Sequence, residues 1–295
     1  MKLKIENLSK TYSNGVQALK NVSLEIPTGM FGLLGPNGAG KSSLMRTIAT
    51  LQEADFGSIF LDDLDILKNK KEVRKILGYL PQEFGVYPKV TAEALLNHIA
   101  VLKGISNKKE RKEVVESLLQ QTNLFEVRKK NLGGYSGGMK QRFGIAQALL
   151  GNPKLIIVDE PTAGLDPAER NRFHNLLSEI GEHIIVILST HIVDDVSDLC
   201  RNMAIINKGR VLMTGDPLKA IEDMQGKVWE KMIEKAELPI YQEKHNVIFS
   251  RLLGGKTIIH VANDSQPETS FKPVIPDLED VYFSAIKMDN VLKAV

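Results

Sequence analysis

Gly35-Pro36-Asn37-Gly38-Ala39-Gly40-Lys41-Ser42 is the stretch of sequence that decides the fold, because it matches the P-loop pattern G-x-x-x-x-G-K-[ST] at every fixed position. The apolar run Met30-Phe31-Gly32-Leu33-Leu34 before it predicts a buried strand. After it, Leu44 and Ile48 share one face at helical spacing and predict a helix. A strand, a loop and a helix are the context that supports a functional P-loop. The stretch therefore predicts a site for a nucleoside triphosphate.

The composition of this loop has a chemical reason. Glycine leaves room for successive backbone N–H groups to converge on a polyphosphate, and the start of the helix adds a partial positive charge that faces the same anion. Lys41 supplies a mobile positive charge for the β- and γ-phosphates, and Ser42 supplies a hydroxyl for Mg²⁺. The residues expected to contact the nucleotide here are Gly35, Pro36, Asn37, Gly38, Ala39, Gly40, Lys41, Ser42 and Ser43.

Composition places the chain among ordinary globular proteins: it has 295 residues, 43% of them hydrophobic and 25% charged. The net charge of +2 gives no strong basic field, so no nucleic-acid partner is expected. Cys200 is the only cysteine, which excludes an intrachain disulfide and suits a reducing compartment. We see no secretory signal, and the apolar run from Ile184 to Leu188 is far shorter than the ~20 residues of a membrane span. We expect a cytoplasmic protein that does not cross a membrane by itself.

Hydrophobic periodicity predicts an α/β fold with several parts. Apolar and polar residues alternate in residues 1–30, which predicts an antiparallel β subdomain beside the P-loop core and a mixed rather than purely parallel sheet. Residues 88–152 predict a helical subdomain, in which Leu95, Ile99 and Leu102 lie on one helix face. Strands and helices then alternate from residue 155 to residue 200, and Met203 to Met213 predicts a hairpin. We expect a nucleotide-binding domain over residues 1–217 and a small α+β domain over residues 218–295.

Four stretches beyond the P-loop, together with Gln82 in Tyr79-Leu80-Pro81-Gln82, narrow the class of P-loop protein. They are Tyr135-Ser136-Gly137-Gly138-Met139-Lys140-Gln141-Arg142, Leu155-Ile156-Ile157-Val158-Asp159-Glu160-Pro161, Ala163-Gly164-Leu165-Asp166 and Ser189-Thr190-His191. This set, in this order, resembles the nucleotide-binding subunit of ABC transporters over about residues 1–215. The resemblance implies a P-loop NTPase fold with ATP and Mg²⁺ as its cofactors.

The resemblance implies a role for each polar residue near the nucleotide. Asp159 resembles the Walker B aspartate, which helps to hold Mg²⁺. Glu160 resembles the general base that orients and deprotonates the attacking water. Gln82 suits the sensing of Mg²⁺ or of this water, and His191 resembles the switch histidine that contacts the γ-phosphate. Catalysis is therefore expected from Glu160, His191 and Gln82, and metal binding from Ser42, Gln82 and Asp159.

The resemblance also implies a second subunit. In the family, the signature turn Ser136-Gly137-Gly138 binds the γ-phosphate held by the opposite subunit, and Asp166 resembles the D-loop aspartate that links the two sites. Two neighbouring positions depart from the family pattern, with Tyr135 in place of Leu and Met139 in place of Gln, but the Ser-Gly-Gly core is retained. Tyr12 resembles the aromatic residue that stacks on adenine.

The resemblance further implies a polytopic membrane permease as a separate partner, with this chain acting as a homodimer at the inner face of the membrane. Glu83-Phe84-Gly85-Val86-Tyr87-Pro88 corresponds to the segment that contacts the permease, although core packing would explain this segment equally well. The segment Leu278-Glu279-Asp280-Val281-Tyr282-Phe283 looks like the tail of drug, lipid or polysaccharide efflux ATPases, which favours an exporter.

The main alternative is a soluble ABC-type ATPase that acts on ribosomes or chromosomes. Chromosome-type relatives carry a long coiled coil between P-loop and signature, and no sustained heptads separate Lys41 from Ser136. Translation-type relatives usually carry two cassettes, whereas this chain has one. A GTPase is disfavoured, because Asn207-Lys208-Gly209-Arg210 has Arg where the pattern N-K-x-D has Asp. A regulatory subunit without catalysis is disfavoured by the intact catalytic set.

Overall fold

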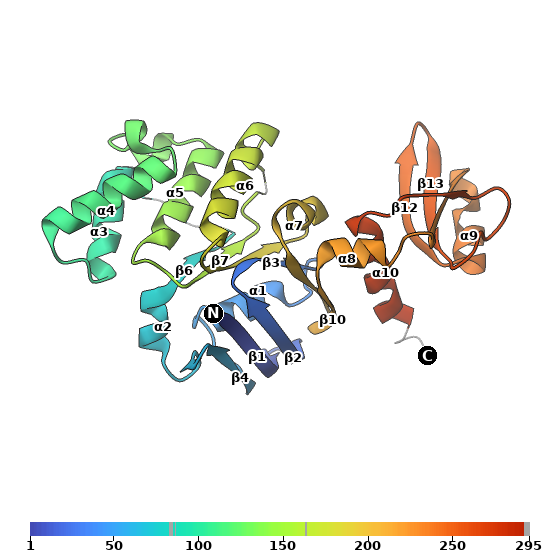
Figure 1. Ribbon diagram of the computed structural model, residues 1–295, viewed down its shortest axis with the longest axis horizontal. Coiled ribbons are helices and arrows are strands. Elements are labelled where there is room, and N and C mark those ends of the chain that lie inside the picture. The colour runs from blue at the N-terminus through green and yellow to red at the C-terminus, as the bar shows by residue number, and fades with distance from the viewer. Residues whose placement is uncertain (83–84, 86, 163, 292–295) are drawn as a thin grey trace.

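A six-stranded sheet of order β10-β9-β3-β8-β7-β6 forms the centre of the computed structural model, which describes residues 1–82, 85, 87–162 and 164–291 (Figure 1). Its strands are β3 (Gly29–Leu34), β6 (Leu77–Leu80), β7 (Leu155–Asp159), β8 (Ile185–Thr190), β9 (Asn202–Asn207) and β10 (Arg210–Gly215). All neighbours pair in parallel except β9 and β10, which form an antiparallel hairpin. The mixed sheet and the hairpin expected from the sequence are confirmed.

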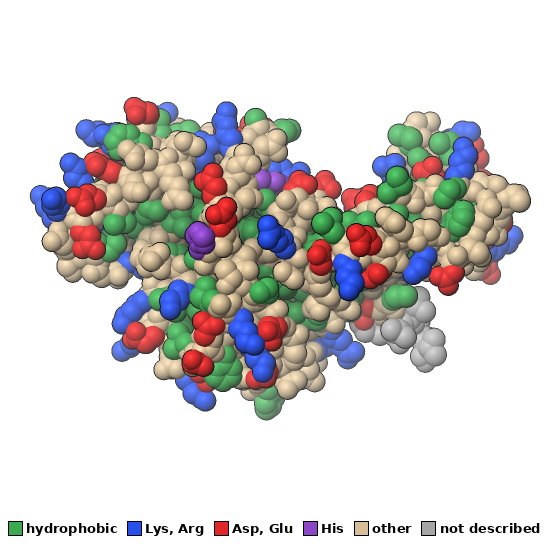
Figure 2. Space-filling model, in the orientation of Figure 1, with side chains coloured by type: hydrophobic (Ala, Val, Ile, Leu, Met, Phe, Trp, Pro, Cys, Tyr) green, Lys and Arg blue, Asp and Glu red, His purple; other side chains and the backbone are tan. Residues whose placement is uncertain are grey.

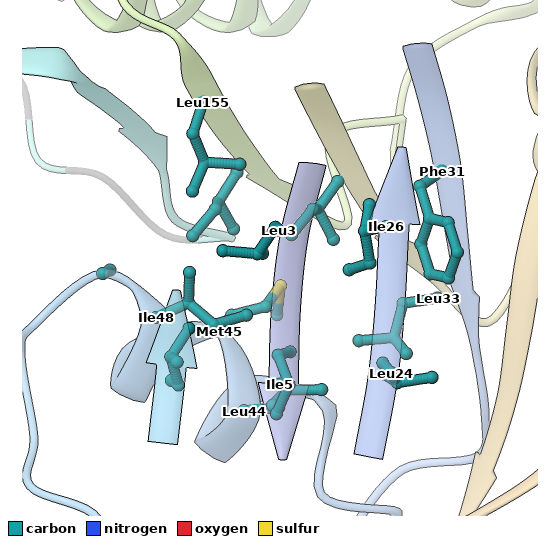
Figure 3. Close-up of a cluster of buried hydrophobic side chains, with 14 of the residues drawn as sticks. Leu3, Ile5, Leu24, Ile26, Phe31, Leu33, Leu44, Met45, Ile48 and Leu155 are labelled. Atoms are coloured by element: carbon teal, nitrogen blue, oxygen red, sulfur yellow. The ribbon is translucent and has the colours of Figure 1, made fainter. Parts of the chain in front are cut away.

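A separate antiparallel sheet of order β2-β1-β4-β5 covers the P-loop helix. Its strands are β1 (Lys2–Thr11), β2 (Gln17–Pro27), β4 (Phe56–Leu61) and β5 (Leu64–Asp65). The period-two alternation has the expected result, since Leu3 and Ile5 point inward with Leu24 and Ile26 (Figure 3). They meet α1 (Lys41–Ile48), so the start of that helix is fixed between two sheets. The short helix α2 (Lys70–Ile76) leads into β6.

Helices cover the other face of the central sheet. The layer on the sheet consists of α5 (Gly137–Leu149), α6 (Pro167–Gly181) and α7 (Val193–Leu199). Beyond α5 lie α3 (Ala92–Leu102) and α4 (Lys108–Gln121), with the single turns η1 (Phe125–Val127) and η2 (Leu132–Gly134), and this bundle has an apolar cluster of its own (Figure 1).

One expectation for the bundle is wrong: Leu102 is 73% exposed. The buried positions of α3 are Ala92, Leu95, Leu96 and Ala100, and the next position on that face is 103, where Lys103 stands. Leu102 therefore lies beside the apolar face at the end of the helix, not on it.

The chain after β10 contains a third, antiparallel sheet of order β12-β13-β11-β14 at one end of the molecule (Figure 1). Its strands are β11 (Val228–Ile233), β12 (Val247–Leu253), β13 (Lys256–Ala262) and β14 (Lys272–Pro273). The turn η3 (Lys235–Glu237) and the helix α9 (Leu238–Lys244) connect β11 to β12. The flanking helices are α8 (Pro217–Glu222) and α10 (Leu278–Val291). Both pack toward the central sheet, since Leu278, Val281 and Tyr282 share a cluster with Met203 and Ile205 of β9, and α10 also contacts β12 of the third sheet. The boundary after residue 217 stays a prediction. Within the described ranges, no helix has both the length and the apolar character that crossing a membrane requires.

Candidate ATP-binding and hydrolysis site

The P-loop connects β3 to α1 and lines a cavity of about 490 Å³. Two of its glycines have the left-handed backbone that favours glycine, with φ of 79° at Gly38 and 107° at Gly40. Gly35 is required for a different reason, because a Cβ there would lie 2.3 Å from the carbonyl oxygen of Ile206 on β9. Backbone conformation therefore explains the glycines at the tip of the loop, and close packing against the sheet explains the glycine at its start.

Lys41 reaches back over the loop. Its Nζ donates hydrogen bonds to the carbonyl oxygens of Gly35, at 2.6 Å, and of Pro36, at 3.3 Å. Burial lowers the pKa of Lys41, while the nearby carboxylates of Glu160 and Asp159 oppose this shift. The ammonium group is thus held, nearly without solvent contact, at the point where a polyphosphate in the cavity would need a cation.

The two predicted carboxylates stand where β7 ends. Asp159 is buried, and this burial, reinforced by the charge of Glu160, raises the pKa of Asp159 against the opposing charge of Lys41. Glu160 turns the chain sharply, with a φ of 47°, and its N–H donates to the carbonyl oxygen of Ser189 on β8 at 2.8 Å. The left-handed conformation of a non-glycine residue is unfavourable by roughly 1–2 kcal/mol, so contacts with the surrounding structure must hold Glu160 in it.

Three polar side chains converge on the Glu160 carboxylate. Its Oε1 lies 3.1 Å from Nδ1 of His191 and 4.0 Å from Nζ of Lys41, and its Oε2 accepts a hydrogen bond of 3.1 Å from Nε2 of Gln82. Gln82 follows β6, Glu160 follows β7 and His191 follows β8, so the carboxyl ends of neighbouring parallel strands deliver all three. The structure brings the predicted catalytic residues together at the P-loop cavity.

The residues predicted to hold a metal offer only oxygen ligands: a hydroxyl from Ser42, a carboxylate from Asp159 and an amide carbonyl from Gln82. This donor set fits Mg²⁺, which prefers oxygen and is usually held by one or two carboxylates together with substrate phosphates. In the part of the chain that the structure describes, no cluster of three or more His, Cys, Asp or Glu residues could hold a metal alone. Burial disfavours the ionised form of the Asp159 carboxyl, so a cation bound here would stabilise its carboxylate.

Tyr12 lines the same cavity from the turn after β1. Its hydroxyl lies 2.9 Å from Oγ of Ser43 and donates to Oε1 of Gln52 at 3.1 Å. The side chain is partly exposed beside the start of α1, so the structure places it at the nucleotide cavity. Its stacking on adenine stays a prediction.

Comparison with known proteins decides the family. The family model described as "ABC transporter" matches residues 19–163. Over 299 aligned residues the chain is 33% identical to YxlF of Bacillus subtilis, an uncharacterized ABC transporter ATP-binding protein, and the match covers 96% of this chain and 99% of YxlF. The chain belongs to the ABC transporter ATP-binding proteins.

A second relative and a solved structure show which part of this ABC protein is shared with known proteins. It is 32% identical to the probable multidrug ABC transporter ATP-binding protein YbhF of Escherichia coli, over 86% of this chain but only 46% of YbhF, so it spans about half of that relative. Among solved structures, the ATP-binding cassette MJ0796, a dimer in a post-hydrolysis state bound to ADP and Pi, is similar with a TM-score of 0.66 and 27% identity. That match covers 72% of this chain and 98% of MJ0796, which confirms the predicted fold class.

The signature turn of this ABC protein lies outside the P-loop cavity, whose described lining residues come from other segments. Ser136 caps α5, its Oγ accepting a hydrogen bond from the Met139 N–H at 3.2 Å, and Gly137 is exposed. Asp166 caps α6 in the same way through the N–H of Glu169. The structure therefore does not bring Ser136, Gly137, Gly138 or Asp166 to the nucleotide site of their own chain.

The two departures from the family pattern are packing residues. Tyr135 is buried in the cluster of the helical bundle, and its hydroxyl donates to the carbonyl oxygen of Val127 at 3.0 Å. Met139 packs against the same cluster. Both side chains fix α5 against the bundle and leave Ser136 and Gly137 exposed. The segment proposed to contact a permease lies partly outside the described residues, which include its Gly85, Tyr87 and Pro88 but not Glu83, Phe84 or Val86.

Sequence reasoning missed a buried network behind the site. It centres on Asp195 of α7, which contacts Thr162, Thr190, Arg170 and His174. The available signal was an acidic residue in a helix whose neighbours Val193 and Val196 point inward. An acid at such a position requires buried partners, but the sequence does not say which elements supply them.

Proposed function

We propose that this ABC protein hydrolyses ATP as a dimer and couples hydrolysis to export through a separate membrane permease. The observation that carries the proposal is the convergence of Gln82, His191 and Lys41 on the Glu160 carboxylate at a P-loop cavity. A carboxylate surrounded in this way can orient a water molecule and accept its proton.

Each residue has a defined task in this reaction. Lys41 exchanges its contacts with the loop carbonyls for the β- and γ-phosphates of ATP. Glu160 accepts the proton of the attacking water, while His191 and Gln82 hold that carboxylate between them. When bound with ATP, Mg²⁺ would be held by Ser42, Asp159 and Gln82 and would neutralise negative charge on the phosphates.

A second copy of the chain completes the site in this proposal. Its signature turn, Ser136-Gly137-Gly138, begins α5 with Ser136 and Gly137 exposed and would offer the backbone N–H groups of the helix start to the γ-phosphate held by the first copy. Asp166 lies at the start of α6 and would face the partner beside it. The dimeric form of the related cassette MJ0796 supports this arrangement. ATP then favours the closed dimer and hydrolysis favours its opening, which is a two-state element suited to transport.

The test of hydrolysis compares phosphate release by the wild type and by Glu160→Gln, with MgATP. We expect turnover to fall by about 10²–10⁴-fold, because the amide cannot accept the proton. ATP binding should persist, and Glu160→Gln should accumulate as an ATP-bound dimer in size-exclusion chromatography. Turnover equal to the wild type would remove Glu160 from its role, and a wild type without ATPase activity would overturn the proposed function.

Coupling to a permease and the export direction rest on different support. YbhF, which matches 86% of this chain, is named as a probable multidrug ABC transporter protein. Acidic and basic side chains are interspersed on the face that Figure 2 shows, and with a net charge of +2 this favours a protein partner over nucleic acid. The protein would lie in the cytoplasm at the inner face of the membrane, bound to its permease.

The partner is tested by affinity capture of tagged Glu160→Gln from its native cells, with ATP and mild detergent. Recovery of a polytopic membrane protein would support transport, and an efflux assay in cells that lack this permease would test the direction. Recovery of ribosomes or chromosomal proteins without a membrane protein would contradict transport and favour the soluble alternative.

A further inference from the structure

Asp195 is a fully buried carboxylate that no step of hydrolysis uses, yet it joins the two loops that carry the catalytic residues. It lies on α7 with no solvent exposure. Its Oδ2 accepts a hydrogen bond of 2.6 Å from Oγ1 of Thr162 and another of 3.3 Å from Oγ1 of Thr190. Thr162 follows the end of β7 and Thr190 ends β8, so one carboxylate oxygen bridges the ends of two neighbouring strands.

The other carboxylate oxygen is bound by α6. Oδ1 of Asp195 accepts a hydrogen bond of 2.8 Å from Nε of Arg170 and lies 2.9 Å from Nε2 of His174. Burial by itself would raise the pKa of Asp195, but the hydrogen bonds from His174 and Thr162 and the charge of Arg170 hold the pKa below its ordinary value. Asp195 is therefore an ionised group with partners on both oxygens.

The two threonines lie next to the residues that converge in the site. Thr162 is two residues after Glu160, and Thr190 directly precedes His191. Oγ1 of Thr190 also accepts the N–H of Ile192 at 2.9 Å, so hydrogen bonds flank His191 on both sides. The separation of 3.1 Å between Nδ1 of His191 and Oε1 of Glu160 is thus set by two loops that share one buried anchor.

We propose that Asp195 is a positioning residue for hydrolysis, which holds the Glu160 loop and the His191 loop in register by accepting from Thr162 and Thr190 while anchored to α6. This inference rests on the proposed ATP hydrolysis. It is specific to the chemical step, because Asp195 and its partners do not line the P-loop cavity that receives the nucleotide. A displacement of about 1 Å at a catalytic group can reduce turnover ~10²-fold without changing substrate binding.

The test measures kcat, KM for ATP and the affinity for a fluorescent ATP analogue in matched variants. Asp195→Asn keeps the shape but removes the charge, and Asp194→Asn, at an exposed position on the same helix, is its control. We expect kcat of Asp195→Asn to fall by about 10–100-fold, with KM and analogue affinity within about twofold of the wild type. Asp194→Asn should match the wild type in all three.

Thr162 gives a second pair of variants that keeps the test decisive if Asp195→Asn fails to fold. Thr162→Val removes the hydroxyl that donates to Asp195, and Thr162→Ser keeps it. We expect a kcat loss of about tenfold in Thr162→Val that Thr162→Ser largely restores, and the double variant with Asp195→Asn should lose no more than the worse single variant. Loss of thermal stability alone, with kcat retained in folded Asp195→Asn, would overturn the proposal, as would equal loss in Thr162→Ser and Thr162→Val.

Failure of this inference can be separated from failure of the proposed function. If the wild type hydrolyses no ATP, the proposed function is wrong, and hydrogen exchange in residues 185–192 then tests the anchor directly. Asp195→Asn should exchange faster there than Asp194→Asn, with the P-loop unchanged. Equal exchange in the two variants would overturn the positioning role.

Discussion

The substitution Gly137→Ala tests whether the signature turn acts in its own chain or on the nucleotide of a second chain. Gly137 begins α5 and is exposed, and an added Cβ would meet no atom within 4 Å. Its backbone is compatible with alanine, because its φ is not among the positive values that favour glycine. A methyl group here should therefore do no harm to the isolated protein.

We expect Gly137→Ala to raise the thermal stability of the isolated protein and to lower its ATP-dependent dimerisation and turnover. Replacing an unstrained glycine by alanine stabilises a protein by about 0.4–1 kcal/mol, because the unfolded chain loses freedom, and this corresponds to a melting temperature higher by roughly 1–4 °C. A hydrogen bond from a backbone N–H to a charged phosphate is worth about 1.5–3 kcal/mol, so obstructing it should lower ATP-dependent dimerisation and turnover by about 10–150-fold.

The assay combines thermal unfolding of the nucleotide-free protein with sedimentation of the ATP-bound dimer in the Glu160→Gln background. Gly138→Ala is the contrasting variant, because its Cβ would lie 2.4 Å from Oε2 of Glu169, a carboxylate that is paired with Arg142. That change should lower the melting temperature as well as dimerisation. Turnover and dimerisation of Gly137→Ala at the wild-type level would refute the assignment of this turn to the partner's phosphate.

Three further outcomes are expected from the described contacts. Lys41→Met should weaken binding of a fluorescent ATP analogue by at least ~100-fold, since it removes the cation held inside the loop, and retained affinity would contradict that role. Gly35→Ala places a methyl group against the carbonyl oxygen of Ile206 and should destabilise by about 1–3 kcal/mol, seen as a lower melting temperature, whereas an unchanged value would show that the loop can shift. Asp280 raises the pKa of His260 against the effect of burial, so the stabilisation is complete below about pH 6.5 and is lost as the pH rises through the raised pKa of the folded state. Unfolding free energies from pH 6 to 9 should fall more for the wild type than for His260→Gln, and parallel curves would contradict this linkage.

The sequence predicted the elements whose signal is local. The glycine spacing located the P-loop, because backbone conformation and close packing permit few residues at those positions. Alternation in β1 and β2 identified their buried faces, since each strand has one face toward α1. The order of the motifs placed Gln82, Glu160 and His191 in one site, which parallel pairing of β6, β7 and β8 then explains.

The features that were not predicted depend on which elements pack together, and sequence periodicity does not determine this. The sequence predicted a small α+β domain over residues 218–295, but not that the apolar face of its last helix, α10, meets α8 and the β9–β10 hairpin as well as the sheet before it. The strand β11 and the helix α9 were not predicted, because the short run Val228–Ile233 mixes Trp, Glu and Lys with apolar residues. The Asp195 network was missed for the same reason: its members come from separate elements and become neighbours only when β7, β8, α6 and α7 have packed.

The position of α10 has a consequence for how the protein is made. Leu278, Val281 and Tyr282 complete the cluster that contains Met203 and Ile205, and about 70 residues separate β9 from α10 along the chain. At the usual rate of synthesis, about 5–20 residues per second, the ribosome makes α10 roughly 4–14 s after β9, and the apolar surface of β9 that α10 covers stays exposed for that time. During that interval the nascent chain presents this surface to its neighbours on the polysome and to chaperones, so slower translation between these two elements would prolong its exposure to aggregation.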